Sequence, residues 1–152
     1  MSAERFTIDT NILIYAGDFR EVAKQPLAAA IVRAAIGRDC RITIQAVMEF
    51  YAAARRRLAM TAAAAAIEAR RHLTLFATIG PSHSATLRAL DAAEAGLFSH
   101  WDALLLATAD EAGCTAALSE DMHDGARFGN LVVRHPFVGS KLSEAAKQLL
   151  EL

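Results

Sequence analysis

The feature that most constrains the fold is the alternation of short apolar runs with longer helical stretches. Short runs that are typical of β-strands occur at residues 5–9, 40–44, 75–79, 115–118 and 131–133. Between and beyond them, the spacing of apolar residues and the helix-ending glycines predict helices at residues 21–36, 45–58, 62–72, 84–95, 99–112 and 141–152. Strands that alternate with helices favour an α/β fold with a short, mostly parallel central sheet and helices on both faces.

Local signals sharpen several of these boundaries. Thr61 is expected to cap the helix that follows it, and Thr10 and Asn11 can cap the helix after the first strand. Gly37 is a natural helix end, and the Gly-Pro pair at 80–81 breaks the strand before it.

The chain reads as one domain. It has 152 residues, close to the commonest domain size, and no linker or low-complexity segment divides it. With 54% hydrophobic and 22% charged residues, it is too apolar and too weakly charged for a disordered protein. We therefore expect a single domain over residues 1–152, with a core at about 6–137 and a tail helix at about 141–152.

The cysteines and the lack of long apolar runs indicate where in the cell the protein is expected. Cys40 and Cys114 form no Cys-x-x-Cys pair, which argues against a disulfide scaffold or a cysteine-bound metal, so buried free thiols are expected. No apolar run approaches the roughly 20 residues of a membrane helix. The first five residues resemble no cleaved leader. We expect a soluble cytoplasmic protein that does not bind membranes.

Acidic residues fall where a parallel sheet places its ligands. Asp9 ends the first predicted strand, and Asp121 lies three residues beyond Leu118 in a later one. In open α/β sheets, ligands bind outside the carboxyl ends of the strands. These two carboxylates are therefore expected at one edge of the sheet.

Two helical acids are candidates for the same place. Asp102 shares a helix face with Leu105 and Leu106, so its carboxylate is expected to point inward and to need a partner. Glu49 has small alanines at i−3 and i+4, which leave room beside its carboxylate.

Four converging carboxylates would repel one another, each pair by about 3 kcal/mol at roughly 5 Å and an effective dielectric near 20. Hard divalent cations prefer oxygen ligands and relieve this repulsion, so the pattern predicts Mg²⁺ or Mn²⁺. A carboxylate-held ion of this kind can activate water and stabilise charge on a phosphodiester. Each acid also has a structural interpretation: Asp9 as a turn cap, Glu49 as a solvated helix residue, Asp102 as part of a capping box with Ser99, and Asp121 as a loop acid.

At these residues the chain resembles a PIN domain, the nuclease fold of VapC-type toxins from bacterial toxin–antitoxin pairs. The resemblance covers about residues 6–137 and rests on four motifs and the closing segment. The motifs are DTNILIYA at 9–16, VMEF at 47–50, WDALLLA at 101–107 and LSEDM at 118–122. The closing strand and Pro-Phe ending lie at 130–137.

The resemblance implies a metal-dependent endoribonuclease, usually a homodimer, that an antitoxin inhibits by occupying the active-site groove. It implies that Asp9, Asp102 and Asp121 hold Mg²⁺ or Mn²⁺ and that Glu49 completes the cluster directly or through water. By the same resemblance, Asn11 and Ser119 would orient acids or a phosphate. A homodimer also fits the alanine-rich helices and the tail leucines Leu142, Leu149 and Leu150, which leave apolar surface to cover.

The net charge is only −1, so any contact with RNA must come from a local patch. The densest basic run, Arg55, Arg56 and Arg57, would bind RNA phosphates or an acidic antitoxin tail, or else form a solvated helix face. Trp101 would stack on a base, or else be a core or interface aromatic.

Other classes of protein fit less well. An aspartyl-phosphate phosphatase would want a second aspartate where Asn11 stands, and no Gly-x-Gly-x-x-Gly motif indicates a dinucleotide site. The remaining alternative is a catalytically silent PIN-like module that binds RNA or protein.

Overall fold

The computed structural model describes residues 3–152, and its centre is the predicted parallel sheet. Strands β1 (Phe6–Ile8), β4 (Ala116–Leu118) and β6 (Leu131–Arg134) pair in parallel in the order β1-β4-β6, and β5 (Arg127–Phe128) joins β6 antiparallel. Strands β2 (Arg41–Thr43) and β3 (Ala77–Ile79) form a separate parallel pair. A bridge between Phe6 and Cys40 brings this pair alongside β1.

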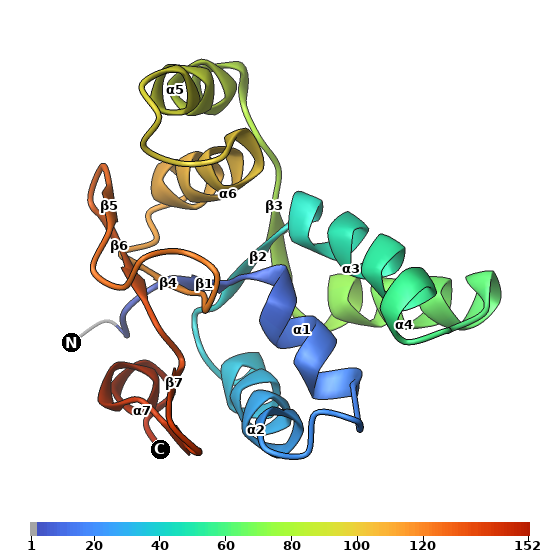
Figure 1. Cartoon of the computed structure of the whole chain (residues 1–152). Helices are drawn as coiled ribbons and strands as arrows, with labels where there is room; N and C mark the ends of the chain where they lie inside the picture. Colours follow the sequence, from blue (N-terminus) through green and yellow to red (C-terminus); the bar gives the residue numbers. More distant parts are fainter. Residues whose placement is uncertain (1–2) are drawn as a thin grey trace.

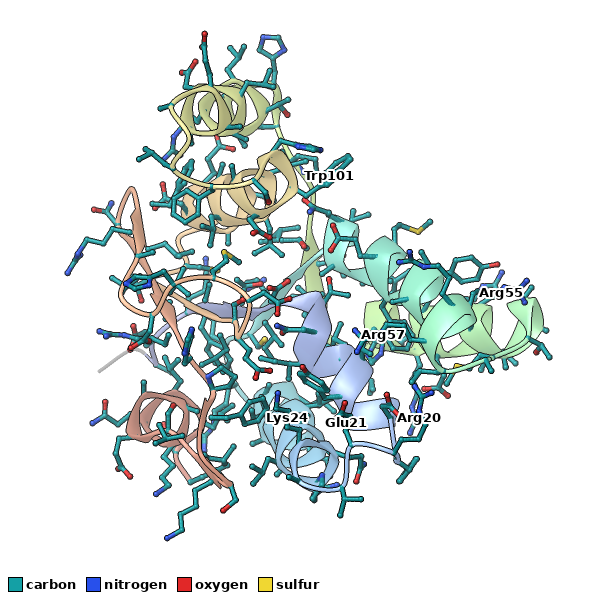
Figure 2. All side chains as sticks on the ribbon, viewed as in Figure 1. Arg20, Glu21, Lys24, Arg55, Arg57 and Trp101 are labelled. Atoms are coloured by element: carbon teal, nitrogen blue, oxygen red, sulfur yellow. The ribbon has the colours of Figure 1, made fainter. Side chains whose placement is uncertain are left out.

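Helices cover both faces of this sheet, as predicted (Figure 1). Helices α5 (His83–Glu94) and α6 (His100–Glu111) lie on one side, and α2 (Lys24–Ile36) and α7 (Glu144–Leu150) on the other. The remaining helices are α1 (Thr10–Gly17), α3 (Ile44–Arg57) and α4 (Ala62–Leu75), and α3 packs on both α1 and α4. The first turn of α6, which carries Trp101, lies beside the start of α3 (Figure 2). The single α/β architecture is therefore confirmed.

Side-chain caps fix where several helices begin. Thr61 accepts a hydrogen bond from Ala64 N at 3.1 Å, as its position in the sequence predicted. The prediction for α1 was wrong in its detail, because Asp9 is the N-cap and its Oδ1 accepts from Thr10 N at 2.7 Å. A residue expected at the site therefore also starts the helix that follows it.

The C-terminal segment also differs from the prediction. Residues Lys141–Leu142 are not helical but form β8, which pairs antiparallel with β7 (Phe137–Val138). Gly139, with φ +58°, allows the tight reversal between these strands, a conformation that costs glycine little. The tail helix starts only after Ser143, whose hydroxyl accepts from Ala146 N at 3.1 Å.

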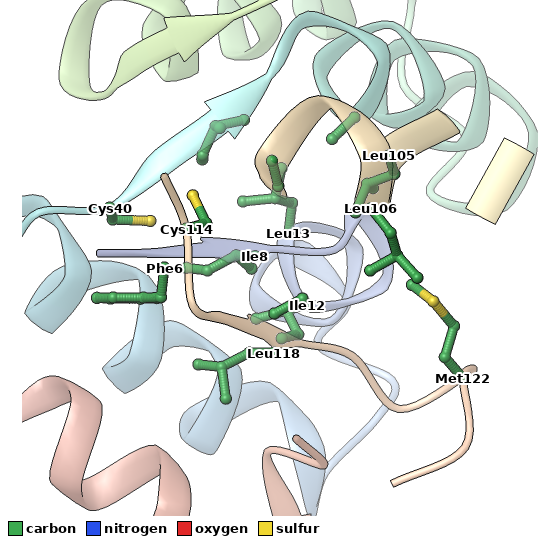
Figure 3. Close-up of a cluster of buried hydrophobic side chains, with 14 of the residues drawn as sticks. Phe6, Ile8, Ile12, Leu13, Cys40, Leu105, Leu106, Cys114, Leu118 and Met122 are labelled. Atoms are coloured by element: carbon green, nitrogen blue, oxygen red, sulfur yellow. The ribbon is translucent and has the colours of Figure 1, made fainter. Parts of the chain in front are cut away.

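The core lies between the central strands and the helices packed on them (Figure 3). Most of the largest buried apolar side chains come from β1, α1, α6 and β4, among them Phe6, Ile8, Ile12, Leu13, Leu105, Leu106 and Leu118. Cys40 and Cys114 lie in this core as free thiols, as predicted. Burial raises the pKa of both thiols, that of Cys114 to about 11, so both stay protonated at neutral pH.

None of the helices in residues 3–152 combines the length and the apolar character that a membrane crossing requires.

Candidate active site

Four acidic side chains line one cavity of about 340 Å³ at the carboxyl ends of β1 and β4. They are the four that the sequence singled out, Asp9, Glu49, Asp102 and Asp121. The sheet register explains half of this convergence: Ile8 pairs with Leu118, so the residues that follow each strand are neighbours. The backbone N–H of Asp9 donates to the carbonyl of Leu118 at 2.9 Å.

Asp9 is the most buried of the four acids, with 6% of its surface exposed. Its Oδ2 accepts a hydrogen bond from Ser119 Oγ at 2.7 Å, and its Oδ1 accepts from Thr10 N. Burial raises its pKa to about 6, and the charges of Asp102 and Asp121 add to the rise, while the two hydrogen bonds oppose it. The carboxylate is thus fixed in position, yet its negative charge is poorly compensated.

Glu49 is held from two sides. Thr10 Oγ1 donates to its Oε2 at 3.0 Å, and Gln45 Nε2 donates to its Oε1 at 2.8 Å. Gln45 also donates to the backbone oxygen of Trp101 at 2.9 Å, which ties α3 to the start of α6. The sequence reasoning missed both supporting residues, although Thr10 directly follows Asp9 and Gln45 lies one helical turn before Glu49.

Asp102 and Asp121 complete the acidic lining. Ser99 is the N-cap of α6, as the capping-box pattern of Ser99 and Asp102 predicted, and its Oγ accepts from Asp102 N at 3.2 Å. Burial raises the pKa of the Asp102 carboxyl, a hydrogen bond with Ser99 lowers it, and the charges of Asp121 and Glu49 raise it further. Asp121 lies on the turn after β4 and is exposed at the cavity. Asp102 therefore lies in the capped first turn of α6, and its carboxylate is also repelled by the charges of Asp121 and Glu49.

The cavity acids differ in their ion pairing from the other shielded acids that the structure describes. In residues 3–152, no lysine, arginine or histidine forms a salt bridge with any of the four. Shielded acids elsewhere are paired: Asp18 with Arg20, Asp39 with Arg5 and Arg41, Asp110 with Arg88, and Glu120 with Lys24. The four carboxylates therefore have no ion-pair partner among the described residues, and Arg56 and Arg57, which line the same cavity, form no salt bridge with them.

The cavity suits a divalent cation in its donor chemistry. Carboxylate oxygens are the ligands that Mg²⁺ and Mn²⁺ prefer, and Asn11 adds a buried side-chain amide whose oxygen and nitrogen have no hydrogen-bond partner. Within residues 3–152, however, no three Asp, Glu, His or Cys side chains are already arranged around one point.

The predicted basic run does not act as one unit. Arg56 and Arg57 line the acidic cavity, whereas Arg55 donates to the carbonyl of Met60 at 3.3 Å. Figure 2 shows Arg57 beside α1 and Arg55 farther from α1. Successive helical residues diverge by 100°, so three in a row cannot share a face.

Two further residues have surroundings that narrow their roles. Ser119 is fully buried behind Asp9, so it orients that acid and has no exposed atom to offer a phosphate. Trp101 is not a core residue: it is 57% exposed and lines an apolar groove of about 560 Å³ with Ile44, Met48 and Leu104. Glu49 lines both this groove and the acidic cavity.

Comparison with known proteins identifies the class of this fold and site. The family model described as the PIN domain matches residues 6–123, so the chain belongs to the PIN domain family. The family predicted from the four motifs is thereby confirmed.

Two solved structures share the fold. VapC20 of Mycobacterium tuberculosis, described as a toxin that cleaves the sarcin–ricin loop, superposes with a TM-score of 0.62 at 18% identity, over 76% of this chain and 91% of that one. VapBC2 of Rickettsia felis, solved bound to a DNA fragment from its promoter, gives a TM-score of 0.62 at 14% identity, over 86% and 97%. A search of curated proteins gave no significant match.

Proposed function

We propose that this chain is an endoribonuclease that depends on Mg²⁺ or Mn²⁺ and acts as the toxin of a toxin–antitoxin pair. One observation carries the catalytic part: four carboxylates share a cavity, and none of them forms a salt bridge within residues 3–152. PIN family membership and the fold shared with VapC20 support RNA as the substrate.

In this proposal Asp9, Asp102 and Asp121 hold the ion, and Glu49 binds it directly or through water. The ion would supply an activated water and would stabilise negative charge on the scissile phosphate. Ser119 and Thr10 hold the Asp9 carboxylate in place through their hydrogen bonds. Because a ligand's hydrogen-bond partners orient it, these residues belong to the function as much as the acids do.

Arg56 and Arg57 are proposed to bind the phosphate backbone of RNA beside the acidic cavity. Both are exposed, line the acidic cavity and lack a salt bridge in the described residues. Their position also attracts a polyanion to an acidic site that would otherwise repel it.

The toxin assignment implies a cognate antitoxin, which we propose as the protein partner. The support is the fold shared with VapBC2, and the partner would block the acidic cavity. The two buried free thiols are consistent with the reducing cytoplasm, where RNA is available.

We also propose that the chain forms a homodimer through the apolar groove beside Trp101, and not through the tail leucines Leu142, Leu149 and Leu150. Leu149 and Leu150 are buried by their own chain and Leu142 is half-buried, so these three leucines offer little free surface. One group of exposed apolar side chains lies along the groove, where Ile44, Met48 and Trp101 are 46%, 61% and 57% exposed. Sedimentation should give about twice 16.3 kDa, and Met48→Glu should give a monomer. A wild type that stays monomeric at micromolar concentration would contradict the dimer.

The test of the catalytic proposal is RNA cleavage by the purified protein with Mg²⁺, with Mn²⁺ and with EDTA. We expect cleavage only with the metals, and loss of nearly all of it in Asp102→Asn. Asp91→Asn, an exposed acid on α5, is the matched control and should cleave normally. Equal cleavage by Asp102→Asn and wild type would reject the site.

The silent-module alternative makes a different prediction. A PIN-like module that has no metal site would show no rise in melting temperature with Mn²⁺, whereas a cavity that binds Mn²⁺ stabilises the folded state.

A further inference from the structure

The turn that carries Asp121 is held by an ion pair that connects distant parts of the chain. Lys24, the first residue of α2, donates from Nζ to Glu120 Oε1 at 2.5 Å. The two residues are 96 positions apart in the sequence, and their side chains are 33% and 28% exposed. Figure 2 labels Lys24 in the region between α1 and α2.

The pair is partly enclosed rather than free in solvent. The Lys24 ammonium lies 4.8 Å from the centre of the Tyr15 ring, and its Nζ is 3.4 Å from the Tyr15 hydroxyl. Tyr15 in turn packs edge-on against Phe137, with ring centres 6.3 Å apart. The other Glu120 oxygen, Oε2, is buried and has no hydrogen-bond partner. Loss of Lys24 would therefore leave a shielded carboxylate without compensation, so the turn would have to move.

The pair fixes one residue of a three-residue turn whose neighbours belong to the acidic cavity. On one side, Ser119 donates to Asp9 Oδ2 through its hydroxyl and to the carbonyl of Arg134 through its backbone N–H. On the other side, Asp121 is exposed and lines the cavity. The position of its carboxylate therefore depends on the backbone of the turn.

We infer that Lys24 is a positioning residue for the acidic cavity: by pairing with Glu120 it holds the turn after β4 so that Asp121 faces Asp9. The pair also keeps Glu120, the acid next to Asp121, out of the cavity. This role rests on the proposed metal site. The hydrogen bond that Lys24 donates to Glu120 raises the pKa of Lys24, so the ammonium stays charged at neutral pH.

The variants Lys24→Met and Glu120→Gln distinguish a positioning role of the ion pair from a purely electrostatic effect of its charges on Mn²⁺ binding. Removing a positive charge near a cation site should strengthen Mn²⁺ binding, and removing a negative charge should weaken it. Positioning predicts instead that Lys24→Met and Glu120→Gln both weaken Mn²⁺ binding, each about tenfold, as is typical when a residue that supports a metal ligand is lost. The double variant, Lys24→Met with Glu120→Gln, should bind Mn²⁺ no more weakly than the single variant that has the lower affinity.

The experiment is calorimetric titration of Mn²⁺ into the purified proteins, with Lys147→Met as the matched control. Lys147 pairs with Glu144 at 2.8 Å on α7, so this variant breaks the same kind of ion pair away from the cavity and should bind Mn²⁺ like wild type. Lys24→Glu combined with Glu120→Lys should restore affinity lost in the single variants, which also guards against a folding defect.

A second readout needs no metal. Hydrogen exchange of the backbone amides at 119–123 should accelerate in Lys24→Met and stay unchanged in Lys147→Met. A wild type that fails to bind Mn²⁺ would overturn the metal site and this role with it. Mn²⁺ binding by Lys24→Met that equals or exceeds that of a binding-competent wild type would overturn the positioning role alone.

Discussion

Two largely buried aspartates in this molecule are satisfied in opposite ways. Asp110 near the end of α6 has 10% of its side chain exposed, and it accepts hydrogen bonds from Arg88 Nη2 at 2.7 Å and from Asn130 N at 2.9 Å. Asp9, with 6% exposure, accepts only from neutral groups, the Thr10 amide and the Ser119 hydroxyl.

This contrast distinguishes Asp110, an acid that stabilises the fold, from Asp9, an acid of the candidate active site. The chain itself supplies the counter-charge of Asp110, and that pair links α5 to α6. The chain supplies none for Asp9, whose pKa rises to about 6 as a result of its burial among other acids. An acid that is held rigidly but left uncompensated is prepared for a cation from solution.

The largest expected difference between the two acids is in catalysis. Asp9→Asn should lower RNA cleavage at saturating Mn²⁺ by at least about 100-fold, because a metal ligand is lost while the fold is kept. Asp110→Asn should leave the cleavage rate per folded molecule near that of wild type. A gel-based cleavage assay, normalised by the folded fraction from circular dichroism, checks both, and a reversed pattern would break the comparison.

Without metal, Asp9→Asn should be more stable than wild type, although it should be less active. Asp9 has a folded-state pKa of about 6 against its usual 3.8, so it favours folding fully below pH 3.8. That contribution is lost as pH rises through 6, and the charged form then costs about 3 kcal/mol. In Asp9→Asn, the amide oxygen can still accept from Thr10 N, and the amide nitrogen can donate to the Ser119 hydroxyl. This variant should therefore melt roughly 5–10 °C above wild type at pH 7.5.

The difference in melting temperature between Asp9→Asn and wild type should close as the pH falls from 6 toward 4. Excess Mn²⁺ should reverse it, so that wild type melts at the higher temperature. Asp102→Asn should show a smaller gain of the same sign, because Asp102 is less buried than Asp9. A melting temperature below wild type for both variants at pH 7.5 without metal would mean that these are ordinary structural acids.

Asp110→Asn should instead destabilise the metal-free protein by about 2 kcal/mol, because it leaves Arg88 without its partner. Arg88 is 37% exposed, so water compensates part of the loss. Urea denaturation measures this free energy, and Mn²⁺ should not change the difference from wild type. A neutral result would show that the Arg88 pair contributes nothing to folding.

The smallest effect concerns the arginines at the cavity. Arg56→Gln and Arg57→Gln should each weaken RNA binding by about 1 kcal/mol and flatten its salt dependence, whereas Arg55→Gln should do much less. Fluorescence anisotropy with RNA at several salt concentrations measures the difference. Equal losses at all three positions would show that the whole helix face binds RNA without regard to the cavity.

Much of the site was predictable because it follows from short-range rules. Asp9 and Asp121 follow strands, and parallel register brings the ends of β1 and β4 together. Helix positions indicated Asp102 and Glu49, the four motifs supported both, and the structure brings both to the same cavity.

What could not be predicted depends on contacts between distant residues. The Lys24–Glu120 pair spans 96 residues, and nothing local to either residue indicates it. The burial of Leu149 and Leu150 requires knowing where the tail helix docks, which is set by the β7–β8 turn before it. The choice of Arg56 and Arg57 over Arg55 depends on the rotation of α3 relative to α1, which a run of like charges does not reveal.

The most direct test of the central claim, that the four acids form one metal site, is a crystal structure of the protein soaked in Mn²⁺, with anomalous diffraction to locate the ion. The account predicts an anomalous peak within bonding distance of an Asp9 oxygen and of at least one oxygen from Asp102 or Asp121, at about 2.0–2.3 Å as for other hard divalent ions. It also predicts that the peak disappears in crystals of Asp9→Asn. A peak elsewhere, or an empty cavity in a protein that still cleaves RNA, would contradict the account.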